Sequence, residues 1–235
     1  METSLHRDLK RHYAADAGAV EVVVEGYRID AVTADGELVE IQHASLGALR
    51  TKTIRLLQGH GHRVRIVKPI VLRKRVTTVS RAGGPALRSR MSPVRGEPTD
   101  LFLELVHFCT VFPRERLTLE AILVEAEEVR VDRQRPTRRG KRFRLVDQRL
   151  VRIDTTLSLA TRRDLIGLLP WQNLPPRFDT AELASAMEKP RWFAQKVAYC
   201  LRHCGAARAV GKRGNSRIYS LDENALARPR SPANL

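Results

Sequence analysis

Two carboxylates near the N-terminus have the residue types and the spacing to bind a metal ion. Alternation along the strand expected over residues 37–42 puts Glu40 and Gln42 on one face. Asp30 lies on the preceding strand, across the tight turn at Asp35 and Gly36, where it can meet Glu40. Two carboxylates inside a sheet repel each other unless a cation neutralises them, and oxygen ligands select Mg²⁺ or Mn²⁺. Such an ion can activate water for attack on a phosphodiester. The alternative that the spacing leaves open is a solvated hairpin face with ordinary acidic residues.

The elements that must position these carboxylates follow from hydrophobic periodicity and turn residues. Apolar residues at four-residue spacing predict a short amphipathic helix from Leu5 to Ala14. We expect strands over 20–25, 27–33 and 37–42, then a helix capped by Ser45, and a fourth strand over 63–70 that ends at Pro69. Residues 1–72 therefore have the order α-β-β-β-α-β and are expected to form the first domain.

This order, with Asp30 followed by Glu40-Ile41-Gln42, resembles the restriction-endonuclease-like nucleases of the PD-(D/E)XK superfamily. The whole chain is also similar to a bacterial family of uncharacterised proteins that combines such an N-terminal domain with a C-terminal winged helix. The stretches that carry this second resemblance are Leu5-His-x-x-Leu-Lys-x-x-Tyr13, Gly26-Tyr-x-Ile-Asp30, Glu40-Ile-Gln42, Ala194-Gln-Lys-x-Ala-Tyr-Cys-Leu-Arg202 and Gly211-Lys-Arg-Gly-Asn215.

The nuclease resemblance implies roles for individual residues. Asp30 and Glu40 would be the ligands of Mg²⁺ or Mn²⁺, and Glu21 on the first strand an auxiliary acid. The superfamily has a lysine where this chain has Gln42, and a neutral amide cannot place a positive charge beside the attacking water. Lys52, on the following helix, is the substitute that the resemblance suggests; the alternative is a solvated helix face. Weaker candidates for acidic ligands, both expected on the first helix, are Glu2 and Asp8.

Charge is the strongest compositional signal. The chain of 235 residues carries 42 Lys and Arg against 26 Asp and Glu, a formal net charge of +16. Residues 1–72 hold 10 basic and 9 acidic residues, so residues 73–235, with 32 and 17, carry almost all of the excess. A sequence pI of about 10.8 is typical of a nucleic-acid-binding protein, although anionic membranes and acidic proteins attract the same charge. This division suits an acidic catalytic part and a basic part that holds a polyanion; unequal solubilisation of the surface is the alternative.

Several classes of protein are excluded by the sequence. No apolar run approaches the ~18 residues of a membrane-spanning helix, and the first residues lack the apolar region of a secretory signal. Three cysteines do not make a disulfide framework. We therefore expect a cytoplasmic protein with no membrane partner.

Residues 73–155 are expected to extend the N-terminal domain. Residues 73–100 hold 7 basic and 2 acidic residues among Gly, Pro and Ser, which predicts a basic linker or flexible arm able to hold phosphates. Thr99–Cys109 is expected to form a buried helix. Strands over 117–131 and 143–159 would flank a basic hairpin tip, and would either extend the nuclease sheet or form a separate β module.

Residues 156–235 predict three helices followed by a basic hairpin, the order of a winged helix-turn-helix. Phe193, Val197, Leu201 and Cys204 define the buried face of the third helix. In this fold the third helix can enter the major groove, and the wing can contact phosphates. The residues expected to bind DNA lie off this face or in the wing: Arg191, Gln195, Lys196, Tyr199, Arg202, Lys212, Arg213 and Arg217. Dimerisation or protein docking is the alternative role of this domain.

Together these patterns predict an α/β (α+β) protein with a restriction-endonuclease-like αβββαβ core, a β-rich extension and a C-terminal winged helix. The expected function is metal-dependent hydrolysis of phosphodiester bonds, with duplex DNA as the partner. Two alternatives stay open: a catalytically inactive, nuclease-like DNA-binding regulator, and a protein-docking adaptor. A homodimer is a further arrangement that the sequence leaves open.

Overall fold

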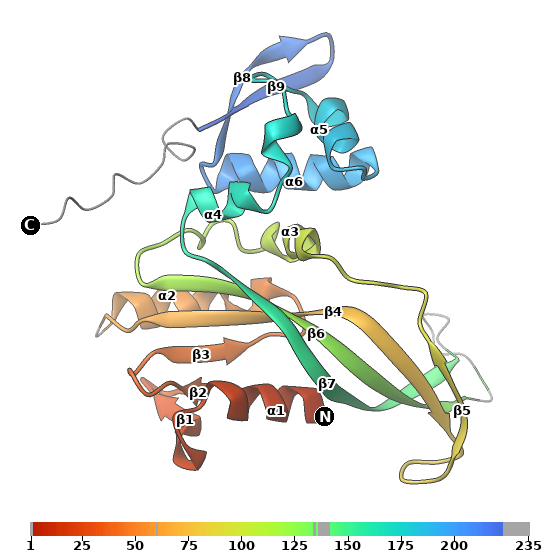
Figure 1. Cartoon of the computed structure of the whole chain (residues 1–235). Coiled ribbons are helices and arrows are strands. Elements are labelled where there is room, and N and C mark those ends of the chain that lie inside the picture. Colours follow the sequence, from red (N-terminus) through yellow and green to blue (C-terminus); the bar gives the residue numbers. More distant parts are fainter. Residues whose placement is uncertain (1, 60, 134, 136–141, 223–235) are drawn as a thin grey trace, which may run out of the picture.

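The computed structural model of this protein describes residues 2–59, 61–133, 135 and 142–222, and it has a mixed α and β fold. A seven-stranded sheet crosses the molecule, and helices lie on both of its faces (Figure 1). A smaller unit of helices and a two-stranded sheet lies beyond one face. The predicted mixture of α and β structure is confirmed.

The helices of the described residues are α1 (Ser4–Tyr13), α2 (Arg50–Gln58), α3 (Leu101–Leu105), α4 (Arg162–Gly167), α5 (Thr180–Ala186) and α6 (Arg191–His203). The strands are β1 (Val20–Val24), β2 (Tyr27–Val32), β3 (Leu38–Ile41), β4 (Val64–Val79), β5 (Ala86–Met91), β6 (Leu117–Asp132), β7 (Phe143–Leu159), β8 (Ala207–Arg213) and β9 (Ser216–Leu221). In the large sheet the strand order is β1-β2-β3-β4-β6-β7, and β5 pairs with β4.

The first part of the chain has the element order that the sequence predicts. The Thr3 side chain caps α1 by accepting a hydrogen bond from the His6 N–H, and Leu5 and Leu9, one turn apart, are fully buried. β1, β2 and β3 pair antiparallel, and α2 connects β3 to β4, which pairs with β3 in parallel. The two strands that carry Asp30 and Glu40 are therefore neighbours.

The prediction that the fourth strand ends at Pro69 is wrong. β4 continues to Val79 and pairs in parallel with β6 along its length. β3 ends at Ile41, and the Gln42 N–H donates to the Val67 carbonyl, so the polar groups of Val67 face β3. The backbone polar groups of alternate residues point to the same neighbouring strand. The nitrogen of Pro69 therefore points to the β3 side, beyond the end of β3, where its missing N–H breaks no hydrogen bond of the sheet.

Much of the segment predicted to be a basic linker is also strand. β5 pairs antiparallel with the outer end of β4, from Arg75 opposite Met91 to Val79 opposite Ala86. The hairpin of β6 and β7 joins the same sheet through β4, so the first of the two arrangements left open by the sequence is the observed one.

Separate apolar layers fill the two faces of the large sheet. Between the sheet and α1 the layer contains Leu5 and Leu9 with Val39, Ile41 and Val67 of the strands. The larger layer on the other face joins the sheet to α2, α3 and the C-terminal helices. The sheet therefore separates α1 from the rest of the helices.

The C-terminal unit begins at α4. Asp179 caps α5 by accepting hydrogen bonds from the N–H groups of Ala181 and Glu182. Just before this cap, Phe178 forms an antiparallel bridge with Tyr219 of β9, so the chain between α4 and α5 joins the edge of the β8–β9 hairpin.

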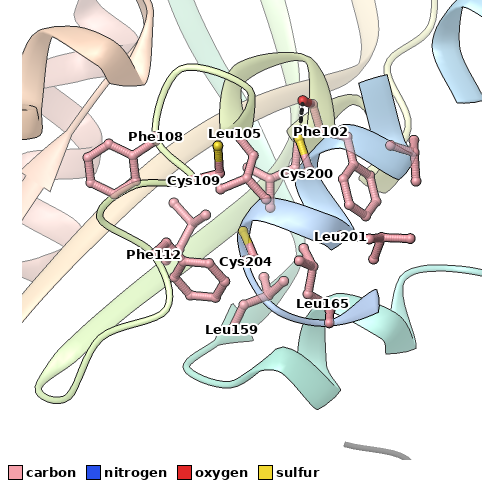
Figure 2. Close-up of a cluster of buried hydrophobic side chains, with 14 of the residues drawn as sticks. Phe102, Leu105, Phe108, Cys109, Phe112, Leu159, Leu165, Cys200, Leu201 and Cys204 are labelled. Carbon is pink, nitrogen blue, oxygen red and sulfur yellow. Dashed lines mark hydrogen bonds between the residues drawn. The ribbon is translucent and has the colours of Figure 1, made fainter. Parts of the chain in front are cut away.

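Helix α6 packs against α3 (Figure 2). The Cys200 thiol donates to the Phe102 carbonyl at 3.5 Å, and Phe102, Leu105 and Leu201 are fully buried around it. The helix predicted over Thr99–Cys109 is shorter than expected, since α3 ends at Leu105 and turns follow it. The C-terminal unit thus shares one continuous core with the large sheet. Within the described residues, no helix is long and apolar enough to cross a membrane.

Candidate active site

Asp30 lies within β2 and faces α1. Its Oδ2 atom accepts a hydrogen bond from the Ile41 N–H at 2.8 Å, and its Oδ1 atom lies 3.3 Å from His6 Nε2 and 3.2 Å from Lys10 Nζ. Burial alone would raise the pKa of Asp30, but the His6 and Ile41 hydrogen bonds and the Lys10 charge outweigh it and lower this pKa overall. Asp30 is therefore held as a carboxylate.

Lys10 of α1 is the centre of an acidic cluster. Its ammonium lies 2.7 Å from Glu2, 2.8 Å from Glu21 and 3.2 Å from Asp30, while only 7% of its side chain is exposed. Burial tends to lower the pKa of Lys10, but the hydrogen bonds to Glu2 and Glu21 raise it overall. The sequence analysis did not identify Lys10. Its position next to the buried Leu9 on the amphipathic helix was the signal that its side chain could lie against the sheet.

All three acids in this cluster, Glu2, Glu21 and Asp30, were candidates from the sequence. Glu21 has a backbone φ of 58°, a left-handed conformation that is uncommon for a residue with a side chain, and its carboxylate bonds both Lys10 and Arg28. Glu2, a weaker candidate, is the second anionic partner of Lys10. Asp8 instead pairs with Arg11, 3.9 Å away on the exposed side of α1.

Glu40 is buried at the end of β3 and pairs with a different lysine. Lys52 Nζ of α2 lies 2.5 Å from Glu40 Oε1 and also donates to the Arg28 carbonyl. Burial raises the pKa of Glu40, and the hydrogen bond and charge of Lys52 offset only part of that effect. The solvated helix face, offered as the alternative for Lys52, is wrong because the ammonium is bound to Glu40.

Asp30 of β2 and Glu40 of β3 lie close together, but helices from opposite faces of the sheet approach them. Asp30 accepts from the backbone of Ile41, the residue next to Glu40, and the Asp30 backbone and charge both act on the Glu40 pKa. α1 supplies the cation at Asp30, and α2 supplies the cation at Glu40. That both carboxylates reach one ion stays a prediction.

Gln42 binds the backbone of the loop that follows β3. Its side-chain amide donates to the Ser45 carbonyl at 2.9 Å, and no hydrogen bond joins it to Asp30 or Glu40 in the described part of the chain. Lys68 of the neighbouring strand β4 binds the same loop. It follows Val67, which lies opposite Ile41, and its ammonium donates to the carbonyls of His43 and Ala44 at 2.8 Å. Gln42 and Lys68 together fix the chain that leaves β3.

The donor set fits a hard divalent cation. Glu40 is a buried oxygen donor and Asp30 a partly buried one on the adjacent strand, and each already binds a positive charge in the form of a lysine ammonium. Mg²⁺ is commonly held by one or two carboxylates together with substrate phosphate. In the described residues no group of three or more His, Cys, Asp and Glu side chains has the arrangement of a metal site.

A hollow of about 650 Å³ adjoins this acidic cluster. Its lining includes Glu2, Lys10 and Glu21, and the exposed guanidinium-bearing residues Arg7 and Arg11 lie on its rim. Acidic groups and arginines thus meet in one concave surface of α1 and β1. A larger cleft of about 900 Å³ lies elsewhere, at the opposite ends of β3, β4 and β6, and contains none of the predicted site residues.

The residues predicted to bind DNA are exposed on α6 and on the β8–β9 hairpin: Arg191, Gln195, Lys196, Tyr199, Arg202, Lys212, Arg213 and Arg217. Some of them have partners within the unit. Arg191 bonds the Ser216 hydroxyl at 3.2 Å, and Arg213 pairs with Glu182 at 3.2 Å. The ammonium of Lys196 lies 5.5 Å from the centre of the Trp192 ring.

Comparison with known proteins gives two similarities. The model of one protein family, described as "Domain of unknown function (DUF8091)", matches residues 3–160, which run from the start of α1 to the end of β7. An "Uncharacterized protein" of Treponema pallidum (strain Nichols) is 28% identical over 218 residues, which cover 93% of this chain and 84% of the relative. No solved structure matches the chain.

Proposed function

The chain belongs to the family described as Domain of unknown function (DUF8091), and we propose that it is a metal-dependent endonuclease that hydrolyses phosphodiester bonds in DNA. The observation that carries this proposal is a pair of carboxylates on adjacent strands, the partly buried Asp30 of β2 and the buried Glu40 of β3. The α-β-β-β-α-β order around them supports a restriction-endonuclease-like core, which resembles the PD-(D/E)XK superfamily.

In this proposal Asp30 and Glu40 hold Mg²⁺ or Mn²⁺. The ion would supply activated water and neutralise charge that develops on the phosphate. His6 and the Ile41 N–H keep Asp30 ionised and fix its orientation. The protein therefore presents an anionic ligand in one conformation before the substrate arrives.

The lysines supply the positive charge that Gln42 cannot provide. Lys52 holds the buried Glu40 carboxylate, and Lys10 holds Asp30 together with Glu21. Their ammonium groups are fixed beside the place where a scissile phosphate would bind, and fixed charges stabilise a developing negative charge without reorganisation.

The C-terminal unit supports DNA as the substrate. The order of α4, the Phe178 bridge, α5, α6 and the β8–β9 hairpin is that of a winged helix-turn-helix. The exposed basic residues of α6 and of the hairpin suit contacts with phosphates and base edges. We propose duplex DNA as the partner on this ground.

One observation favours a second candidate, a nuclease-like DNA-binding regulator without activity. Each of the two carboxylates already has a lysine partner, and Gln42 is bonded to the backbone of Ser45. In a regulator these lysines would be permanent counter-ions rather than groups that face a substrate.

Cleavage assays separate the two candidates. Full-length protein is incubated with linear, branched and single-stranded DNA in Mg²⁺ or Mn²⁺, beside the variants Asp30→Asn and Glu40→Gln. Asp35→Asn, in the exposed turn of the same hairpin, is the matched control. Cleavage that is lost in the first two variants and kept in the control supports the nuclease, whereas binding without cleavage by any form supports the regulator.

A further inference from the structure

We propose that the outer part of the large sheet binds the phosphate backbone of the nucleic acid through one of its faces. This arginine face consists of Arg88 and Arg90 on β5, Arg130 on β6 and Arg142 just before β7. The inference rests on the proposed function, because it names a second surface for the same polyanion.

The four side chains line one hollow of about 210 Å³. Arg88 is fixed by Thr78 Oγ1 at 3.2 Å and by Asp132 at 2.8 Å, and the Arg130 guanidinium lies 3.7 Å from the centre of the Phe143 ring. The hollow is thus a formed surface whose walls come from four strands or their ends.

The arginine face carries uncompensated positive charge. Glu128 pairs with Arg130, and Asp132 pairs with Arg88. Arg90 and Arg142 are exposed and form no ion pair with any residue that the structure describes. A guanidinium can donate two parallel hydrogen bonds to a phosphate, so these two groups are suited to the backbone of a nucleic acid.

On the opposite face of the same strands, the acidic residues alternate with arginines and pair with them. Thr77 and Arg75 lie on it, since Val76 and Thr78 line the arginine face and side chains alternate. Glu127 there accepts from Thr77 at 2.7 Å and pairs with Arg149 at 3.5 Å. Glu125 likewise pairs with Arg73 and Arg152. These acidic residues make this face less favourable for binding a polyanion.

The arginine face lies on the same side of the sheet as α1 and the Asp30 cluster. Leu150 of β7 packs in the apolar layer beneath α1 and lies opposite Ala126 of β6, two residues before Glu128. The start of α1 is fixed to β7, because the Ser4 N–H and hydroxyl both donate to Asp147, at 2.8 and 2.7 Å.

In Figure 1 the outer ends of β4 to β7 bend toward the side covered by α1, whereas the C-terminal unit lies beyond the other face. A nucleic acid on the arginine face therefore runs toward Asp30. The described part of the C-terminal unit, residues 162–222, lies beyond the other face, so the two surfaces contribute separate phosphate contacts.

The test measures binding rather than cleavage. Fluorescence anisotropy of a short labelled duplex, in EDTA and over a series of salt concentrations, gives the salt dependence of affinity for the full-length protein. The variants are Arg90→Ala with Arg142→Ala, and the matched control on the opposite face is Arg75→Ala with Arg149→Ala. Loss of two phosphate contacts should lower the slope of log K against log salt by about 1.8, equally for unrelated sequences.

The control variant, which removes the same formal charge, should keep the wild-type slope. Equal slopes for the arginine-face variant and the wild type, while Lys212→Ala still lowers the slope, would overturn this inference alone. Equal losses in both double variants would also overturn it, because the effect would then be one of net charge. No binding of the wild type to any DNA would overturn the proposed function as well.

Discussion

Replacement of Lys10 by methionine tests whether the acidic cluster is built around one cation. Methionine keeps much of the chain volume of lysine and removes its charge. Glu2, Glu21 and Asp30 would then face one another with no shared ammonium, while His6 would remain beside Asp30 and Arg28 beside Glu21. We expect Lys10→Met to lower the free energy of unfolding.

The magnitude follows from the exposure of the partners. Removing one member of a buried ion pair costs about 3–5 kcal/mol. Glu2 and Glu21 are 36% and 34% exposed, so water screens their repulsion, whereas Asp30 is 20% exposed. With this discount for screening, we expect a loss of roughly 2–3 kcal/mol.

The assay is urea unfolding followed by circular dichroism at neutral pH, with and without Mg²⁺ or Mn²⁺. A divalent cation at a hundred times its dissociation constant should stabilise Lys10→Met by about 2.7 kcal/mol, and the wild type by less, because in the wild type it competes with the Lys10 ammonium for the acidic groups. Arg11→Met is the matched control, because Arg11 is 76% exposed on the same helix and its only described ion pair is the 3.9 Å contact with Asp8.

Equal stability of Lys10→Met and Arg11→Met would refute the argument that Lys10 neutralises the cluster. Equal effects of the cation on Lys10→Met and on the wild type would refute the argument that the ammonium competes with a divalent cation for these acids.

Four other predictions follow from the structure. Lys52→Met should cost about 3 kcal/mol by leaving Glu40 buried without a cation, and the double variant with Glu40→Gln should recover part of this in a double-mutant cycle. The pKa of Asp30 is lowered by folding, so the stability that its ionised form contributes is complete above its unfolded pKa and is lost as pH falls through the folded value. Wild type and Asp30→Asn should therefore converge in unfolding free energy at acid pH. Phe102→Ala should cost roughly 3–5 kcal/mol, and limited proteolysis should then release the C-terminal unit, because Phe102 is fully buried between α3 and α6. Lys212→Ala should lower the salt slope of DNA binding by about 0.9 if the hairpin contacts one phosphate through it.

Local patterns in the sequence determined the order of the elements and the neighbourhood of the two carboxylates. The turn at Asp35 and Gly36 makes β2 and β3 adjacent, and this alone brings Asp30 near Glu40. The apolar spacing on α6 likewise determined its buried face, including Phe193, Val197 and Leu201. These inferences depend on residues that are close in the chain, where turn type and periodicity fix geometry.

Tertiary structure alone decided which charges meet. Lys10 reaches Asp30 and Glu21 only because α1 packs across the sheet, and Lys52 reaches Glu40 only because α2 packs on the other face. β4 runs past Pro69 because β3 has ended beside it, which no property of the β4 sequence reveals. An ion pair or a strand edge is set by the chain that lies opposite, and that chain is remote in sequence.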